Sequence, residues 1–509
     1  MDNLSKLQTY TPKERNMYLL GMFGQNMIYN IIATGLTFYF QSVIFVPAIA
    51  TSIIFAVARV WDAINDPMMG TIVDKTKNKY GKCRPYLIAC PSIIMIITIL
   101  CFTNGIYSSS NSSTVNTLIV AWAGISYILW GMSYTVGDIP LWGITSLMTE
   151  KESDRSKILS LARISAGLAG GVVLLMIIPL SQKIGQLLEN VISNPLKSQQ
   201  VGFIIVAVVL TVIGSVLFQL TGIFVKERVK SSEKRYTMKE NFKLMWSNKP
   251  FRQILVSSVL RAPIMLLMSV AMTLLSYYYG NYWNDYLLYM IILGGAIFGG
   301  QFIAMALVPM MIKKYEKKAL YNVSALASAV AFVLVFVVYK IAPTQLDKPL
   351  WLAVLFLVFL IAGAGLGALT VLQSVMIADA VDYEEYHNGI RPDGVFFSGQ
   401  SFATKLSSGI SAIIQGVVFA AVAFSGDGVA KINEALRNGA VFKTDFPEVA
   451  TAMFFLCSIP PAIGLLLSVI PTWKYAMSDK EHQKMLDELH DRRVAAGKAE
   501  EEKAEVEAK

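Results

Sequence analysis

Two acidic residues lie one helical turn apart inside an apolar stretch of the sequence. Asp62 and Asp66 are four residues apart and Asn65 is next to Asp66, so a helix presents all three on one face. Carboxylate and amide oxygens are hard ligands that suit Na⁺, Li⁺ or H⁺, whereas zinc or copper would need the imidazoles or thiols that this stretch lacks. The pattern predicts a cation site, with Asp62 and Asp66 as ligands of Na⁺ or acceptors of H⁺.

A purely structural role is the alternative for this acidic pair. Arg59 precedes Asp62 by three residues and could neutralise it without any bound ion. An ionisable side chain at the centre of a bilayer costs about 2.5–3.5 kcal/mol on insertion scales, so such groups are retained mainly where they have a function. Asp62 also lies about 20 Å along a helix from Lys75. This depth favours the cation site.

A second polar face occurs further along the chain. Thr135, Asp138 and Trp142 have the i, i+3, i+7 spacing of one helical face. A carboxylate can accept hydrogen bonds from two sugar hydroxyls while an indole ring covers the apolar C–H face of the sugar. A lone tryptophan is more often an anchor at the membrane interface. The aspartate one turn away favours a sugar-binding pair.

Two basic residues also lie inside apolar stretches. Arg163 has a fork of donors that can bridge sugar hydroxyls and a carboxylate, and Lys405 is a point charge suited to an acidic cluster. The formal charges of these two bases and of the three aspartates above sum to −1, which one monovalent cation would neutralise. If Arg59 is counted as well, the charges balance without a cation, so the sum alone does not require a coupling ion.

Membrane helices must position these residues. Of the 509 residues, 54% are hydrophobic and only 16% are charged, and the mean hydropathy is +0.52, whereas a soluble domain is about a quarter charged. These values exclude a disordered chain, a disulfide scaffold and an ordinary cytosolic enzyme. The cysteines have no paired spacing and the histidines form no ligand cluster, so we predict no cofactor beyond the coupling cation.

A spanning helix needs about 20 mostly apolar residues, and the sequence offers twelve such stretches. They lie near residues 17–46, 48–73, 85–104, 115–149, 157–184, 199–225, 251–279, 284–312, 318–341, 350–380, 395–424 and 449–474. Lys and Arg gather in the loops after the second and eighth stretches and between the sixth and seventh. The positive-inside rule therefore places these loops and both termini in the cytoplasm, and the net charge of +9 indicates membrane orientation and not nucleic-acid binding.

The basic connector in the middle divides the chain into two similar halves. We predict six-helix bundles over residues 1–225 and 251–475, a cytoplasmic connector over 226–250 and a charged cytoplasmic tail over 476–509. Such a duplication is typical of the major facilitator fold, whose substrate site lies at mid-membrane between the halves. The predicted fold class is an all-α membrane protein with twelve transmembrane helices in two six-helix halves.

Three motifs resemble those of the glycoside–pentoside–hexuronide:cation symporter family. They read RVWDAINDPMMGTIVDKTKNKYGKCRPY, YILWGMSYTVGDIPLW and IADAVDYEEYHNGIRPDG, and the first is highly specific. The resemblance extends over essentially the whole chain to about residue 475. It implies a secondary active transporter of the cell membrane that couples movement of a sugar or glycoside to Na⁺ or H⁺ by alternating access.

The resemblance also implies a role for individual residues. It places the cation at Asp62, Asn65, Asp66 and Thr135 and the sugar at Asp138, Trp142, Arg163 and the adjacent Tyr134, and it couples the two sites through Lys405, Gln400 and Arg59. Gln25 and Asn26 stand where the best-known member of the family has a lysine and a sugar-binding aspartate. We expect this amide pair to contact the sugar without supplying an anionic acceptor. The sugar therefore stays open among glycosides, xylosides and glucuronides.

Other functions fit the sequence less well. A lysophospholipid carrier on the same fold would line its cavity with apolar groups, unlike the second polar face. An enzyme would need a nucleophile pair or a zinc set, and a channel would need repeated carbonyl or charge rings, none of which the sequence shows. A non-transporting sensor stays open. The expected partners are a small sugar and the lipid bilayer, with a monomer as the expected state and no nucleic acid.

Overall fold

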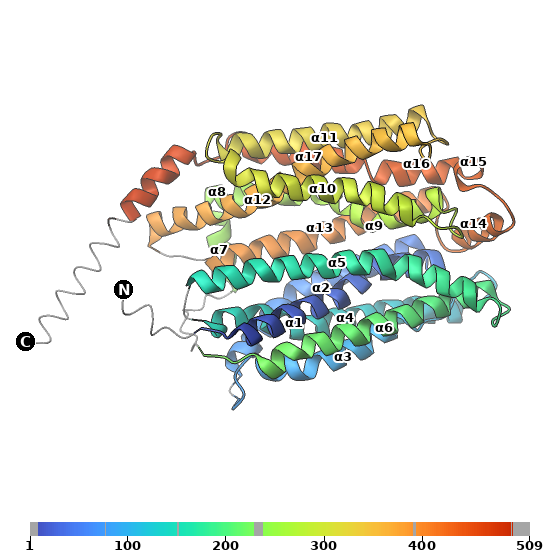
Figure 1. The fold of residues 1–509 in the computed structure, drawn as a ribbon, viewed down its shortest axis with the longest axis horizontal. Coiled ribbons are helices and arrows are strands. Elements are labelled where there is room, and N and C mark those ends of the chain that lie inside the picture. Colours follow the sequence, from blue (N-terminus) through green and yellow to red (C-terminus); the bar gives the residue numbers. More distant parts are fainter. Residues whose placement is uncertain are drawn as a thin grey trace, which may run out of the picture. The chain divides into compact units, whose positions relative to one another are not determined.

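The computed structural model describes residues 9–76, 78–149, 152–228, 238–389, 393–489 and 491. All regular structure in this part of the chain is helical, and it contains no strand. Figure 1 shows the helices as long, coiled ribbons with their labels. The fold class predicted from the apolar stretches agrees with this all-helical structure.

The N-terminal helices follow the predicted spans closely. They are α1 (Pro12–Asn30), α2 (Ala48–Lys75), α3 (Arg84–Phe102), α4 (Ser113–Met148), α5 (Glu152–Leu188) and α6 (Pro195–Phe224). The first span continues beyond α1 as two π-helical segments, Ile31–Leu36 and Tyr39–Val43. The hydropathy of the sequence gave no sign of this change in helix type.

The C-terminal helices are more often interrupted. They are α7 (Met238–Ser247), α8 (Lys249–Leu260), α9 (Met265–Leu274), α10 (Leu287–Met311), α11 (Lys317–Ile341), α12 (Pro349–Asn388), α13 (Asp393–Ala421), α14 (Asp427–Arg437), α15 (Phe442–Asp445), α16 (Pro447–Leu456) and α17 (Ile459–Trp473). The seventh predicted span consists of α8, a 3₁₀ turn, α9 and the π-helical segment Leu275–Tyr279. The short helices α7, α14 and α15 were not predicted, because a search for spanning apolar stretches does not detect short polar helices.

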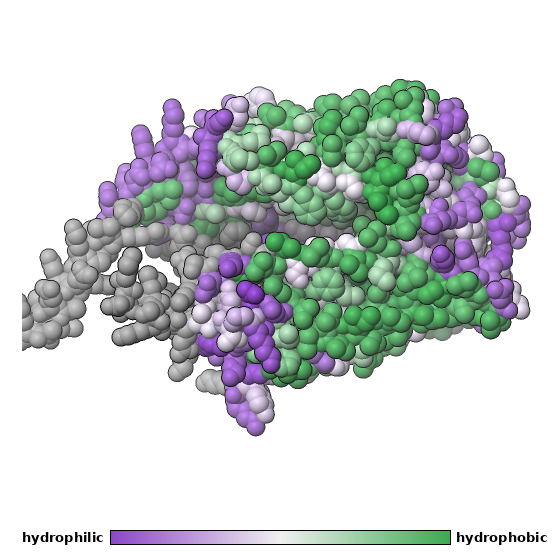
Figure 2. Space-filling model, viewed as in Figure 1, coloured by the Kyte–Doolittle hydropathy of each residue, from purple (hydrophilic) through white to green (hydrophobic). Residues whose placement is uncertain are grey.

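Ten stretches among the described residues are long and apolar enough to cross a membrane. The α1 segment and α2 are the other two predicted spans. Many large hydrophobic side chains on these helices are exposed in the chain itself, such as Leu118, Phe302 and Leu350. On the visible face in Figure 2, hydrophobic side chains cover the middle of the helices and hydrophilic ones lie towards their ends. This pattern is that of a surface covered by lipid.

Contacts divide the chain into two compact units. The first contains Met1–Arg235, Met265–Tyr289 and Ser408–Leu456, and the second contains Tyr236–Ile264, Met290–Ser407 and Cys457–Lys509. The boundaries of the six-helix halves, the connector and the tail stay a prediction from the sequence. Each unit is described by itself below.

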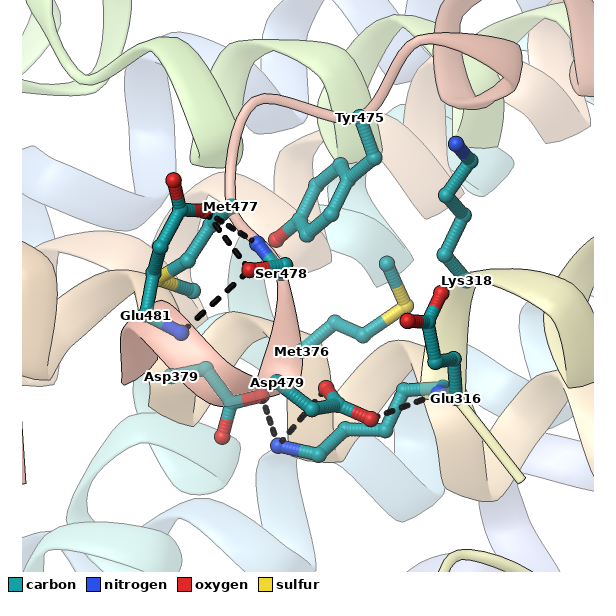
Figure 3. A pocket seen from close by; sticks show the side chains of 10 residues that line it. Glu316, Lys318, Met376, Asp379, Tyr475, Met477, Ser478, Asp479 and Glu481 are labelled. Atoms are coloured by element: carbon teal, nitrogen blue, oxygen red, sulfur yellow. Dashed lines mark hydrogen bonds and ion pairs between the residues drawn. The ribbon is translucent and has the colours of Figure 1, made fainter. Parts of the chain in front are cut away.

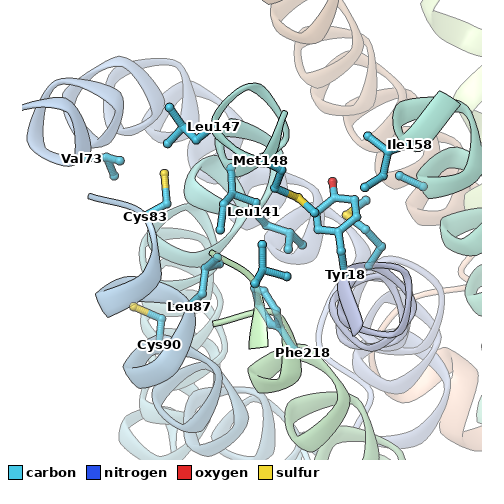
Figure 4. Packing of buried hydrophobic residues seen from close by; sticks show 14 of the residues in the cluster. Tyr18, Val73, Cys83, Leu87, Cys90, Leu141, Leu147, Met148, Ile158 and Phe218 are labelled. Carbon is cyan, nitrogen blue, oxygen red and sulfur yellow. The ribbon is translucent and has the colours of Figure 1, made fainter. Parts of the chain in front are cut away.

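The core of the first unit fixes the helices that carry the polar residues. Tyr18 from α1, Leu87 from α3, Leu141 from α4 and Phe218 from α6 are fully buried in one cluster (Figure 4). The close approach of α1 to α6 requires a glycine, because a Cβ atom on Gly24 would lie 2.3 Å from a backbone oxygen of α6. This packing holds the middle of α1 against α6.

Polar contacts tie the two later segments of the first unit to its N-terminal helices. The Tyr282 hydroxyl and the Asn433 amide both donate to the carbonyl of Ser42, over 3.1 and 3.0 Å. Arg437 forms a two-pronged ion pair with Glu189, with N–O distances of 3.0 and 2.6 Å. Segments that are far apart in the sequence are thereby joined within one unit.

Candidate functional site

The predicted cation ligands come together in the first unit. Asp62 and Asn65 on α2 are only 6% and 4% exposed. The Thr135 hydroxyl of α4 lies 3.1 Å from Asp66 Oδ1 as a donor, and it shares its hydrogen with the backbone carbonyl of Gly131. The Asn65 amide nitrogen is buried without a hydrogen-bond partner among the described residues. The structure thus gathers two carboxylates, an amide and a hydroxyl, all oxygen donors suited to a small hard cation.

Arg59 is the internal counter-ion of one of the two carboxylates. Its guanidinium donates to Asp62 Oδ2 over 3.0 Å and to the Tyr127 hydroxyl over 2.9 Å. The other carboxylate oxygen of Asp62 reaches α4 at Gly131, where a Cβ atom would lie only 3.1 Å away. A cation at this site must therefore share Asp62 with Arg59 or displace it. The pairing that the sequence offered as a structural alternative is present at Asp62.

The predicted sugar-binding residues of α4 form a second cluster with the amide pair of α1. The Gln25 amide nitrogen donates to Asp138 Oδ1 over 2.7 Å and also to the Tyr134 hydroxyl. The Trp142 indole donates to the same Asp138 oxygen over 3.1 Å. The Asn26 side-chain amide donates to Gln25 Oε1 over 2.6 Å. Gln25 of α1 therefore contacts Asp138 directly, and Asn26 contacts Gln25 in turn, which the sequence alone did not reveal.

Arg163 lies beside this cluster. Its guanidinium carbon is 6.0 Å from the centre of the Trp142 ring, which is within cation–π range. The side chain is exposed. In the part of the chain that the structure describes, it makes no ion pair. The guanidinium N–H groups of Arg163 are therefore available to bind a ligand beside the Trp142 indole.

Aromatic residues that the sequence reading did not single out surround Tyr134. Its ring stacks on Trp130 with centroids 4.8 Å apart and lies 5.5 Å from Tyr29 of α1. Tyr127 continues the column on α4, 6.2 Å from Trp130. The i, i+3, i+7 spacing of Tyr127, Trp130 and Tyr134 was visible in the sequence, but the contribution of Tyr29 depends on how α1 packs.

The two predicted coupling residues of α13 belong to the other unit. Gln400 and Lys405 are half-buried and belong to the second unit. Their link to the cation and sugar clusters stays a prediction.

The helix α4 carries both clusters at neighbouring positions. Thr135 faces the acidic pair of α2, while Tyr134 and Asp138 face Gln25 of α1. A change in the rotation or tilt of α4 must therefore affect the two clusters together. Among the described residues, no group of three or more His, Cys, Asp or Glu side chains could hold a metal ion.

The model of the MFS/sugar transport protein family matches residues 17–479. The match includes every residue of the two clusters. The chain belongs to this family. It is a multi-pass membrane transporter and not an enzyme, and the family agrees with the one that its motifs resemble.

Two relatives illustrate the range of this family. The chain is 25% identical over 487 residues to the uncharacterized symporter YjmB of Bacillus subtilis, with coverage of 94% of this chain and 95% of the relative. It is 26% identical over 410 residues to the isoprimeverose transporter of Lactiplantibacillus pentosus, with coverage of 80% of each. Both relatives are similar over most of their length, so the transporter shares their overall organisation.

Solved structures support the fold alone. The transporter is similar to a bacterial homologue of the human lysosomal transporter Spinster in an inward-facing, unoccupied conformation, with a TM-score of 0.63 and 14% identity. The similarity covers 91% of this chain and 98% of that one. The predicted major facilitator fold is thereby confirmed.

Proposed function

We propose that the transporter moves a sugar or glycoside together with Na⁺ or H⁺ by alternating access. In this proposal the cation binds at Asp62, Asn65, Asp66 and Thr135, and the sugar binds at Asp138, Trp142, Arg163 and their neighbours. The observation that carries it is the placement of Thr135 and Tyr134 next to each other on α4, each in contact with a different cluster. Cation binding and sugar binding would then change the same helix, as coupled transport requires.

The polar character of the second cluster supports a sugar and not a lipid as cargo. Gln25, Asp138, Trp142 and Arg163 together offer amide, carboxylate, indole and guanidinium groups. A lysophospholipid would leave these groups without partners over its acyl chain, at a cost for each unsatisfied polar group. The isoprimeverose relative supports a pentose-containing glycoside as the first substrate to test.

The acidic pair gives the sharpest test of ion coupling. Asp66→Asn keeps the size of the side chain and removes its charge, so we expect uptake of labelled isoprimeverose into proteoliposomes to lose its stimulation by a Na⁺ or pH gradient. Asp285→Asn is the matched control, because Asp285 is exposed and lies in a loop. If a Na⁺ or pH gradient stimulates uptake by Asp66→Asn as strongly as uptake by the wild type, the proposed cation site is refuted. Comparison of the two gradients in the wild type identifies the cation.

We also propose that one chain is the working unit, because it contains all candidate residues. Both termini lie in the cytoplasm in this proposal, because the basic loops follow the positive-inside rule. All four native cysteines are buried. An impermeant maleimide should therefore label Ser110→Cys in intact cells and label Gln483→Cys only after the membrane is opened. The reverse pattern would overturn this orientation.

A further inference from the structure

A short helix over residues 479–489, the terminal helix, follows α17. Ser478 and Glu481 cap its start reciprocally: the Ser478 hydroxyl accepts from the Glu481 N–H over 3.2 Å, and the Ser478 N–H donates to Glu481 Oε2 over 2.8 Å. The hydrogen bonds from the Ser478 N–H and hydroxyl lower the pKa of the Glu481 carboxyl. The helix therefore begins at a defined residue.

One histidine of this terminal helix faces two carboxylates of α12. His482 Nε2 lies 3.2 Å from Asp382 Oδ2, and His482 Nδ1 lies 3.6 Å from Asp379 Oδ1. His482 is only 7% exposed, whereas its neighbour Gln483 is exposed. Asp379 and Asp382 are three residues apart, so α12 presents both on one face. The imidazole thus bridges two acids of a different helix.

A lysine at the start of α11 strengthens this contact. The backbone N–H of Lys317 donates to Asp479 Oδ2 over 3.0 Å, and its ammonium group is 3.7 Å from Asp479 Oδ1. The same ammonium group forms an ion pair with Asp379. Lys317 therefore joins α11, α12 and the terminal helix at one point.

The segment that leads into the terminal helix is attached to α8. The Gln253 amide donates to the carbonyls of Pro471 and Lys474 over 2.9 and 2.8 Å, and its oxygen accepts from the N–H of Ala476 over 2.8 Å. Residues 474–489 consequently contact α8, α11 and α12, all within the second unit.

The contact surface is polar and incompletely packed. Lys317, Met376, Asp379, Tyr475 and Asp479 are among the residues that line a cavity of about 110 Å³ under the terminal helix (Figure 3). The Tyr475 hydroxyl is buried and has no hydrogen-bond partner in the described part of the chain, and burial raises the pKa of this group well above its usual range. Charged groups that are nearly buried pay a desolvation penalty, and the water that they regain on separation offsets part of the ion-pair energy that is lost. This helix is therefore suited to detach and rebind.

We propose that residues 475–489 are a reversible clamp on the ends of α8, α11 and α12, with His482 as its central contact. In transporters of this fold, helix bundles move largely as rigid bodies. The clamp makes three helix ends that are distant in sequence move together. It goes beyond the proposed function, because neither the cation site nor the sugar site includes any of its residues.

The imidazole offers one nitrogen to each of the two aspartates of α12. A charged ring donates from both nitrogens, to Asp379 and Asp382 at once, whereas a neutral ring has a single N–H. Lys317 from α11 and Asp479 from the terminal helix are charged groups at the same contact, and Glu316, Lys318 and Glu481 also line the cavity beside it.

Hydrogen–deuterium exchange of the purified full-length protein tests the contact. We expect His482→Ala at pH 6 to speed exchange about tenfold in peptides over 478–489, as for the loss of a hydrogen bond to a charged group. The adjacent, exposed Gln483→Ala should stay at the wild-type rate. Asp382→Asn should reproduce the effect from the α12 side. The clamp would be overturned if His482→Ala left the exchange rate of residues 478–489 unchanged, or if Gln483→Ala raised that rate as much as His482→Ala does.

Uptake of labelled isoprimeverose by proteoliposomes tests whether the clamp serves transport. His482→Ala should lower the maximal rate at least threefold and leave KM unchanged, because the sugar cluster lies in the other unit. A variant with fast exchange and a wild-type rate would overturn this role. If the wild type itself takes up no isoprimeverose, the choice of substrate is at fault and the exchange experiment alone decides on the clamp.

Discussion

Thr135 is the side chain through which α4 reaches the acidic pair. Its hydroxyl is 3.1 Å from Asp66 Oδ1, and it is 4% exposed. Hydrogen bonds to charged groups contribute about 1.5–3 kcal/mol. This hydroxyl and the hydrogen bond from Arg59 to Tyr127 are two polar contacts between α2 and α4.

Removal of the Thr135 hydroxyl should weaken cation binding selectively. Thr135→Val keeps the shape of the side chain, so we expect the cation concentration for half-maximal uptake to rise about 10- to 100-fold, measured with isoprimeverose at saturation. Thr145→Val is the matched control, because Thr145 is equally buried on α4 and bonds only the backbone of its own helix. An unchanged cation dependence of Thr135→Val would remove this residue from the site.

The helical period explains which site residues could be predicted. Asp62, Asn65 and Asp66 share a face of one helix, so their proximity follows from sequence spacing alone. The contacts of Gln25 with Asp138 and of Arg59 with Tyr127 cross between helices. Such contacts depend on helix rotation and packing distance, which hydropathy does not specify.

At the scale of elements, the start of α1 is anchored by a buried acid. Glu14 accepts from the Arg228 guanidinium over 2.9 and 2.8 Å and from the Thr11 N–H over 2.8 Å. Burial opposes ionisation of Glu14, but the hydrogen bonds from Arg228 and Thr11 outweigh it and lower the pKa of this carboxyl below its usual 4.5. The charged form is therefore favoured in the folded state.

This anchor should give the transporter an acid-sensitive component of stability. Because the folded pKa of Glu14 is lowered, its contribution is fully present above about pH 4.5 and is lost as the pH falls through the folded pKa. Glu14→Gln should lower the unfolding temperature at pH 7 and approach the wild type as the pH falls below 4.5. Thermal unfolding in detergent at several pH values measures this. An equal difference between the two proteins at every pH would contradict the assignment.

The positions of the spans were more predictable than their internal geometry. A run of apolar residues shows that a helix crosses the bilayer, and the bounds of α3, α6 and α11 lie within a few residues of prediction. The π-helical segment Ile31–Leu36 is as apolar as these helices, whereas Leu275–Tyr279 consists mainly of tyrosine. Their helix type follows from packing against neighbours, so composition cannot reveal it.

At the scale of the whole molecule, transport requires that contacts joining distant segments open and close. Within the first unit, Ser42 is joined to Tyr282 and Asn433, and Glu189 to Arg437. The segments joined in this way come from both predicted halves of the chain. We expect these contacts to be among those that break in the transport cycle, because alternating access moves the halves against each other.

The central claim is that the carboxylates of α2 bind the coupling cation. Isothermal titration of the purified transporter with NaCl, at constant ionic strength and in buffers of different ionisation enthalpy, registers both Na⁺ binding and proton exchange. We predict saturable binding of Na⁺ or a saturable proton exchange. Isoprimeverose should raise the affinity for the cation by the same factor by which the cation raises the affinity for the sugar. Asp66→Asn should abolish the binding of the cation. Cation binding by Asp66→Asn at wild-type affinity would contradict the account.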